Sequence, residues 1–280
     1  LKERHLARTI IVNSGNANAC TGTRGEADAR RMAAIAASAV GCVPMDVQVC
    51  STGVIGAPLP MDKIEAGVPE VIKALREDGL EDFADAICTT DTHRKVRSAQ
   101  GEIAGRSVHV AGASKGAGMI HPNMATMLGF VLTDAPVQAE DLDAVWRRVC
   151  AKSFNAITVD GDTSTNDTAL IMASGAVGGS VFKGQHLEQL EKLLLDVAAE
   201  LAKDIVRDAE GATKLVEMKI TGASCAHDAL LASNAVALSP LVKTAIHGED
   251  PNWGRIVAAA GRSGAKVDPD AMSLWIGDVL

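Results

Sequence analysis

Residues 112–128 read GASKGAGMIHPNMATML and lead directly into an apolar run. Gly116 and Gly118 permit backbone conformations that are closed to other residues, and Pro122 fixes one backbone dihedral. Thr126 then stands where a turn enters a strand, so its hydroxyl is held in a defined place. A threonine at a strand start is usually structural. The rest of the sequence has to decide between a structural and a catalytic interpretation.

Composition limits the class of protein before any motif is considered. The chain has 280 residues, 47% of them hydrophobic and 22% charged, which suits one large or two closely packed domains. A net charge of -8 without a basic run argues against nucleic acid as a partner, and 2% aromatic residues argue against base stacking. No apolar stretch approaches the ~20 residues that span a bilayer. We therefore expect no membrane partner.

The six cysteines are scattered, without the close pairs of zinc or redox motifs. They indicate buried, reduced thiols in a cytoplasmic protein, with an organellar copy as the alternative.

The hydrophobic periodicity mixes strands and helices along the whole chain. Runs rich in β-branched residues predict strands at 9–12, 47–50, 107–110, 130–133, 156–159, 215–220 and 273–276. Apolar spacings of three and four predict helices at 26–40, 61–75, 142–149 and 187–205. We expect Pro69 to break or kink the second helix. The predicted class is α/β, an α+β layered sandwich with mixed sheets covered by helices.

Seven segments together carry a resemblance that no single motif would support. Besides 112–128 they are NSGNANACTG (13–22), STGVIG (51–56), TTDT (89–92), DGDTSTND (160–167), RDAEGATK (207–214) and VKTAIHGEDPNWGR (242–255). In this order they resemble the ornithine acetyltransferase family, also called bifunctional glutamate N-acetyltransferase. The blocks run through nearly the whole chain and are far more specific than one glycine-rich loop.

The resemblance implies a self-processing fold whose chain cuts itself between Ala125 and Thr126. The segments 1–125 and 126–280 would stay folded together as a heterodimer and assemble further into a heterotetramer. Cleavage would make Thr126 both a nucleophile and an N-terminal residue, and an α-amine with a pKa of about 7.7 to 8.0 can serve its hydroxyl as a base. The substrates implied are N2-acetylornithine as acetyl donor and glutamate as acceptor. No cofactor is implied.

The resemblance also allows acetyl-coenzyme A as a second donor, which some members of the family accept, and no feature of the sequence decides between one donor and two. The donor range therefore stays open at this point.

The same resemblance implies roles for five further positions. Thr52 and Gly53 correspond to the oxyanion hole, which donates a hydroxyl and a backbone N–H to the tetrahedral intermediate. Thr92, Lys115 and Glu210 correspond to substrate-binding residues, together with the nucleophile itself. The alternatives are ordinary: a strand end with a tight turn at STGVIG, a solvated lysine and an exposed glutamate at a helix end.

Some features depart from the family pattern or add nothing to it. Ala209 stands where a glycine is expected. Asp160, Asp162 and Asp167 have calcium-loop spacing but lack the glycine and the terminal glutamate of such a loop, so we expect scaffold or site-bordering residues and no metal. Family members extend beyond both ends of this chain, and their segment that supplies an Asn and a Thr or Ser to the substrate lies beyond Leu280. We therefore expect a fragment.

Two other functions compete with acetyl transfer. An amidase or aminopeptidase of a related self-processing fold would pass the acyl group to water, and acetate release would reveal it. An uncleaved, non-catalytic amino-acid-binding scaffold would run as one intact chain on a denaturing gel.

Overall fold

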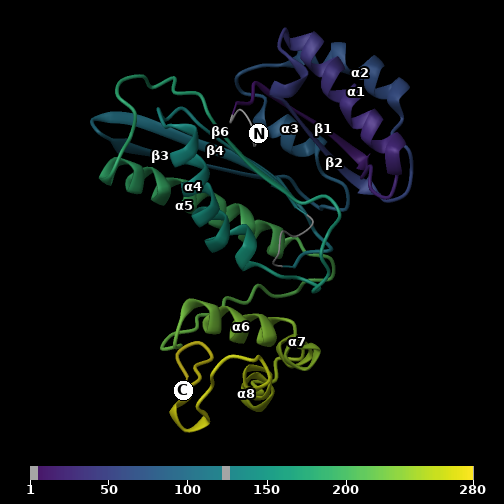
Figure 1. The fold of residues 1–280 in the computed structure, drawn as a ribbon. Helices are drawn as coiled ribbons and strands as arrows, with labels where there is room; N and C mark the ends of the chain where they lie inside the picture. The colour runs from purple at the N-terminus through teal and green to yellow at the C-terminus, as the bar shows by residue number, and fades with distance from the viewer. Residues whose placement is uncertain (1–5, 122–126, 280) are drawn as a thin grey trace. The chain divides into compact units, whose positions relative to one another are not determined.

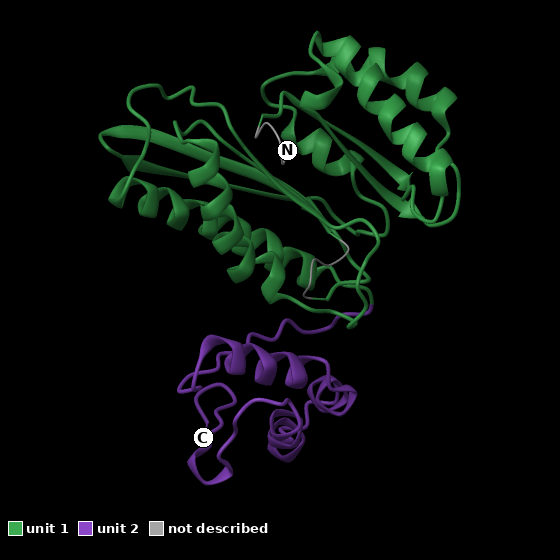
Figure 2. Cartoon of the chain, in the orientation of Figure 1, with its two compact units in different colours: residues 1–210 green, residues 211–280 purple. Residues whose placement is uncertain are grey.

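The computed structural model describes residues 6–121 and 127–279, and the chain divides into two compact units (Figure 2). Unit 1 comprises Leu1–Glu210 and unit 2 comprises Gly211–Leu280. The predicted cleavage point between residues 125 and 126 therefore falls inside unit 1, within one packed body.

Unit 1 holds two sheets (Figure 1). Its elements are β1 (Thr9–Asn16), α1 (Gly22–Val40), η1 (Pro44–Asp46), β2 (Val47–Val54), α2 (Met61–Ala74), α3 (Leu80–Ala86), β3 (Lys95–Ile103), β4 (Arg106–Lys115), β5 (Leu128–Thr133), α4 (Ala139–Lys152), η2 (Phe154–Ala156), β6 (Thr168–Ala173) and α5 (Gln185–Arg207). β1 and β2 pair in parallel. The other sheet has the order β3-β4-β5-β6, antiparallel except for the last pair. These mixed sheets with covering helices agree with the predicted α/β class.

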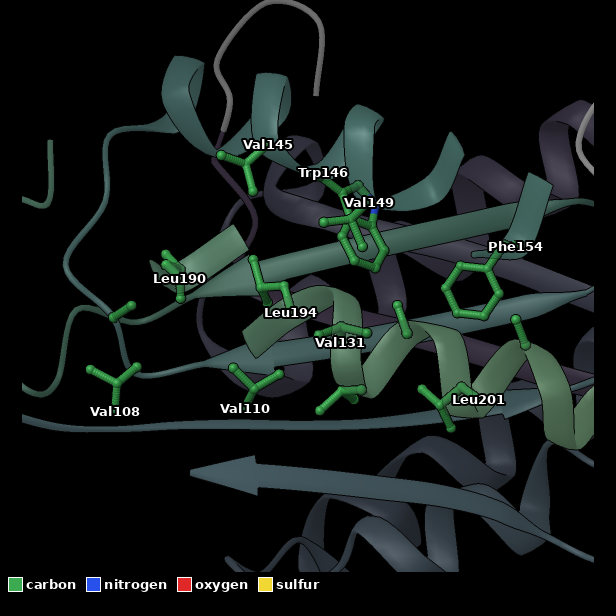
Figure 3. Close-up of a cluster of buried hydrophobic side chains, with 14 of the residues drawn as sticks. Val108, Val110, Val131, Val145, Trp146, Val149, Phe154, Leu190, Leu194 and Leu201 are labelled. Atoms are coloured by element: carbon green, nitrogen blue, oxygen red, sulfur yellow. The ribbon is translucent and has the colours of Figure 1, made fainter. Parts of the chain in front are cut away.

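Strand β5 is buried on both faces except at Leu132, in keeping with its almost continuous apolar run. On one face Val131 packs under α4 and α5 with Val145, Leu194 and Phe154 (Figure 3). On the other face Leu128 and Phe130 pack with Cys50 of β2 and Ile87. The alternation along β5 therefore joins the two sheets of unit 1 around a second core.

The remaining face of the β1-β2 pair is covered by α1 and α2. Met32 of α1, Leu59 and Met61 form a cluster with partly buried side chains of β1 and β2. The helix α1 ends at Gly41, which has a left-handed φ of 73° and donates its N–H to the carbonyl of Ala37. Pro69 lies inside α2 and does not break it.

Unit 2 is built from short apolar helices. They are α6 (Ala226–Ala237), α7 (Pro240–His247) and α8 (Trp253–Gly261), followed by the turn η3 (Pro269–Ala271). Val236, Val242 and Ala259 form its core. None of the helices in the described residues could cross a membrane alone; α6 and α7 taken together reach the required length and composition but are bent by 60° where they meet.

Three predicted strands are wrong. At 156–159 the turn η2 ends, and the Val159 N–H and the Thr158 hydroxyl both donate to the carbonyl of Ile120 without forming a strand. The segment 215–220 has no regular structure, because the described part of unit 2 offers no sheet edge to receive its backbone donors. At 273–276 only an isolated bridge from Ile276 to Val279 forms.

The sequence patterns did not predict strands β3 and β6 or helices α3, α6, α7 and α8. β3 (KVRSAQGEI) is polar at most positions because it pairs on one side only. β6 (TALIMA) is rich in residues that favour helices.

Candidate active site

A buried lysine at the end of β4 connects the two sheets of unit 1. Lys115 is 3% exposed, and its Nζ donates to Thr52 Oγ1 at 3.2 Å and to Thr89 Oγ1 at 2.7 Å. The carboxylate of Asp91 lies 3.6 Å from the same nitrogen. The solvated cation that was the alternative for Lys115 is therefore wrong, since its ammonium is enclosed by two hydroxyls and a carboxylate.

Thr52 and Gly53 lie side by side at the end of β2. The Thr52 hydroxyl is buried and, within the described residues, accepts from Lys115 without donating to any acceptor. Its hydrogen is therefore free for an incoming oxygen. Gly53 has a φ of 132°, and a Cβ there would lie 2.2 Å from the carbonyl carbon of Gly15. Only glycine fits at this contact between NSGNANACTG and STGVIG.

Burial and charge act on Lys115 and Asp91 in opposite ways. Burial lowers the pKa of Lys115, and the neighbouring carboxylate of Asp91 opposes that effect only in part. Burial by itself would raise the pKa of Asp91, but hydrogen bonds from Lys95 and from the Gly116 N–H, together with the charge of Lys115, lower it. Asp91 is thus an anion at neutral pH beside a lysine that gives up its proton more easily than usual.

The charged chain continues from Asp91 to the end of α5. Lys95, 1% exposed, donates to Asp91 Oδ1 at 2.7 Å and to Asp208 Oδ2 at 2.6 Å. Asp208 also accepts from the Thr92 N–H at 3.0 Å and from the Thr92 hydroxyl. Two cations and two anions, Lys115, Asp91, Lys95 and Asp208, therefore form one buried chain of neutral net charge, which we call the four-charge chain.

This chain separates two of the three threonines of the TTDT motif, Thr89 and Thr92. The hydroxyl of Thr92 is committed to Asp208, whereas Thr89 meets Lys115 directly. The role of Thr92 as a substrate ligand stays a prediction, and Thr89 is the threonine that the structure brings to Lys115 and Thr52.

Glu210 lies beside the backbone that follows β4. Its N–H donates to the Ala117 carbonyl at 2.9 Å, and its carboxylate lies over Gly118, where an added Cβ would be 3.2 Å away. The side chain is exposed. Ala209, which stands in place of an expected glycine, is buried, and the left-handed residue of this turn is Gly211, with a φ of 71°. The exchange at Ala209 therefore leaves the turn intact.

Ala125 and Thr126 lie outside the described residues, but the chain on both sides is fixed. Leu128 is the register partner of Lys115. Asp160 accepts from the N–H groups of Met119 at 2.6 Å and Ile120 at 3.0 Å. The loop 160–167 thus holds the backbone before the predicted cleavage site.

The same loop also holds the backbone after that site. Asp167 accepts from the Met127 N–H at 3.1 Å, and burial raises the pKa of its carboxyl to about 7, against a smaller opposing effect of this hydrogen bond. Asp160 and Asp167 therefore border the site, as the sequence indicated, and their oxygens bind backbone N–H groups.

Sequence reasoning named Thr52, Gly53, Lys115 and Glu210, whose roles stay predictions, but passed over the groups that hold them. Asp91 and Asp208 stand within motifs that were recognised as blocks, yet neither was singled out. Lys95 lies in a polar strand and gave no signal. The structure brings Thr52 and Lys115 into direct contact. Thr92 instead contacts Asp208, at the far end of the four-charge chain, and Glu210 lies beside Gly118.

These features can be compared with known proteins. The profile of the ArgJ family matches residues 1–280. The chain belongs to the ArgJ family. The arginine biosynthesis bifunctional protein ArgJ of Geobacter sulfurreducens is 53% identical over 274 residues, which cover 97% of this chain and 70% of that protein. The ArgJ protein of Symbiobacterium thermophilum is 51% identical, with 97% and 68% covered.

A crystal structure of the ArgJ protein from Bacillus halodurans is similar as well, with a TM-score of 0.50 and 44% identity over 51% of this chain and 68% of that one. The chain thus spans roughly two thirds of the length of the ArgJ proteins it matches. The resemblance seen in the seven sequence blocks is confirmed.

Proposed function

We propose that this ArgJ protein transfers an acetyl group from N2-acetylornithine to glutamate through an acetyl-enzyme on Thr126, after self-cleavage between Ala125 and Thr126. The observation that carries the proposal is the contact between Lys115 and the Thr52 hydroxyl, in a strand register that pairs Lys115 with Leu128. Two residues of chain span at most about 7 Å. We therefore infer that Thr126, which precedes Leu128 by two residues, acts at this contact.

The first half of the reaction forms the acetyl-enzyme. The Thr126 oxygen bonds to the acetyl carbonyl carbon, and its proton passes to the α-amine that cleavage has freed. The carbonyl oxygen becomes an oxyanion that accepts hydrogen bonds from the Thr52 hydroxyl and the Gly53 N–H. The carbon–nitrogen bond then breaks, the nitrogen takes the proton, and ornithine leaves.

The second half returns the acetyl group to an amine. The amino nitrogen of glutamate attacks the ester carbonyl carbon, and the same oxyanion hole receives the charge. The bond to the Thr126 oxygen breaks, a proton from the nitrogen returns to that oxygen, and N-acetylglutamate leaves. Atoms and charges balance without a cofactor.

The charges near the contact suit amino-acid substrates. The cation of Lys115 draws electron density from the Thr52 oxygen and makes that hydroxyl a better donor to the oxyanion. The Glu210 carboxylate can receive the ammonium group of ornithine, because it is exposed and lies beside Gly118. We extend the proposal to Thr92 as a further ligand, to acetyl-coenzyme A as a second donor and to the heterotetramer in the cytoplasm.

Hydrolysis and simple binding are less well supported. The relatives are named bifunctional proteins of arginine biosynthesis, a name that fits acetyl transfer and not an amidase or aminopeptidase. Purified protein supplied with N2-acetylornithine and glutamate should form ornithine and N-acetylglutamate in equal amounts. Acetate in place of N-acetylglutamate, or an intact inactive chain, would contradict the proposal.

A further inference from the structure

The four-charge chain contains more buried charges than substrate binding alone requires. Lys95, Asp91 and Asp208 have side chains that are at most 2% exposed. Removing such groups from water is costly unless each charge is paired and hydrogen-bonded. Here every charge is paired, and one end of the chain meets the predicted oxyanion hole. Because burying these charges costs free energy, we expect them to have a role in the site.

We propose that Asp91 is a positioning residue for the oxyanion hole: it holds the Lys115 ammonium against the Thr52 hydroxyl, and Lys95 with Asp208 fixes Asp91 in turn. The inference rests on the proposed acetyl transfer. It adds three residues to the site that act through Lys115 and touch no reacting atom.

The hydrogen bonds around Asp91 show how it fixes the ammonium. Its Oδ1 accepts from Lys95 Nζ and from the Gly116 N–H, both at 2.7 Å, so the carboxylate cannot rotate. Its Oδ2 accepts from the Thr89 N–H at 3.2 Å and lies 3.6 Å from Lys115 Nζ. Since Gly116 directly follows Lys115, Asp91 holds both the side chain of this lysine and the backbone next to it.

The direction of the Thr52 hydroxyl follows from this arrangement. An ammonium only donates, so the Thr52 oxygen that accepts from Lys115 must direct its own hydrogen elsewhere. If Lys115 lost its proton, its nitrogen could accept from Thr52 and draw that hydrogen away from the oxyanion. A protonated Lys115 is therefore the form that keeps the oxyanion hole open.

Besides burial, three titratable groups affect the protonation of Lys115. Asp91 favours the protonated form, and so does the nearby Cys88 thiol when ionised, whereas Lys95 disfavours it. Burial raises the pKa of Cys88 above its usual value, which limits its contribution near neutral pH. Asp208 bears on Lys95 directly and has His93 beside it, 3.2 Å away. Asp91 is therefore the main support of the Lys115 charge.

The test is Asp91→Asn, with Asp204→Asn as its matched control. Asp204, on α5 one turn before Asp208, has a similarly buried carboxylate that pairs with Arg97 and Arg207. Its backbone carbonyl accepts from the Asp208 N–H, but among the described residues its side chain contacts no member of the four-charge chain. For Asp91→Asn we expect kcat to fall about a hundredfold. We also expect the alkaline limb of the kcat profile to move to lower pH. Asp204→Asn should change neither.

A second readout follows Lys115 without relying on catalysis. In protein carrying nitrogen-15 at lysine Nζ, nuclear magnetic resonance should show Lys115 losing its proton at lower pH in Asp91→Asn than in the wild type. An unchanged titration would overturn the inference. A shifted titration in protein that transfers no acetyl group would instead contradict the proposed function and leave the hold of Asp91 on Lys115 standing.

Asp91→Asn leaves one excess buried cation and so endangers folding. The double variant Asp91→Asn with Lys95→Met removes one charge of each sign and keeps the chain neutral. Its Lys115 should still titrate below the wild-type pH, by less than in the single variant, because Asp91 affects Lys115 more strongly than Lys95 does. A titration at or above the wild-type pH would refute the positioning role.

Discussion

Replacing Thr52 by valine removes one hydroxyl from the predicted oxyanion hole and little else. Thr52 is 3% exposed, and valine has nearly the same shape. Lys115 keeps Thr89 at 2.7 Å and Asp91 at 3.6 Å, so its charge is not left unpaired. The loss of one oxyanion donor costs about 2.7 to 4 kcal/mol of transition-state stabilisation, which is roughly a 10² to 10³-fold fall in kcat.

The KM for N2-acetylornithine should stay within a few-fold of the wild type, because the charge that Thr52 meets develops only in the transition state. The assay is the initial rate of N-acetylglutamate formation over a range of donor concentrations, normalised to the cleaved fraction on a denaturing gel. Thr52→Ser keeps the hydroxyl and should retain most of the rate. Wild-type kcat in Thr52→Val, or an equal loss in Thr52→Ser, would refute the reasoning.

Three other substitutions, one of them with a control, test the packing and the titration of unit 1. Gly53→Ala should lower the free energy of unfolding by about 2 to 5 kcal/mol in urea denaturation, since its Cβ would meet the Gly15 backbone at a strained φ. Phe154→Ala, in the core of Figure 3, should lower the free energy of unfolding by about 3 to 5 kcal/mol. Its control Leu75→Ala, at the exposed C-terminal end of α2, should lower it by less than about 0.5 kcal/mol. Asp167→Asn should stabilise the fold at pH 8 but not at pH 4. The reason is that a carboxyl with a pKa raised to about 7 destabilises the fold progressively as pH rises from about 4 to 7. Equal urea midpoints of the variant and the wild type at pH 8 would contradict this.

The sequence predicted the parts of the fold that local patterns determine. Helices α1, α4 and α5 have long apolar stripes, and β1, β2, β4 and β5 are rich in β-branched residues, so their periods identified them. The segment 215–220 has the same strand pattern and forms none, because a strand also needs a partner edge. That partner is a property of the whole fold and cannot be read from six residues.

The candidate site shows the same limit. Thr52, Lys115 and Glu210 were found through motifs that resemble a known family. The burial of Lys95 could not be foreseen, because a lysine in a polar strand is normally solvated and its partner Asp208 lies 113 residues away in sequence. Which of Thr89 and Thr92 contacts Lys115 likewise could not be predicted without the position of Asp208, which binds the Thr92 hydroxyl.

The most direct test of the acetyl-enzyme on Thr126 is the mass of the purified protein before and after incubation with N2-acetylornithine in the absence of glutamate. We predict two segments, residues 1–125 and 126–280, and the gain of one acetyl group on the second alone, lost again when glutamate is added. Thr126→Ala should give one intact chain that gains no acetyl group. An active protein whose second segment keeps its mass, or whose acetyl group resides on another residue, would contradict the account.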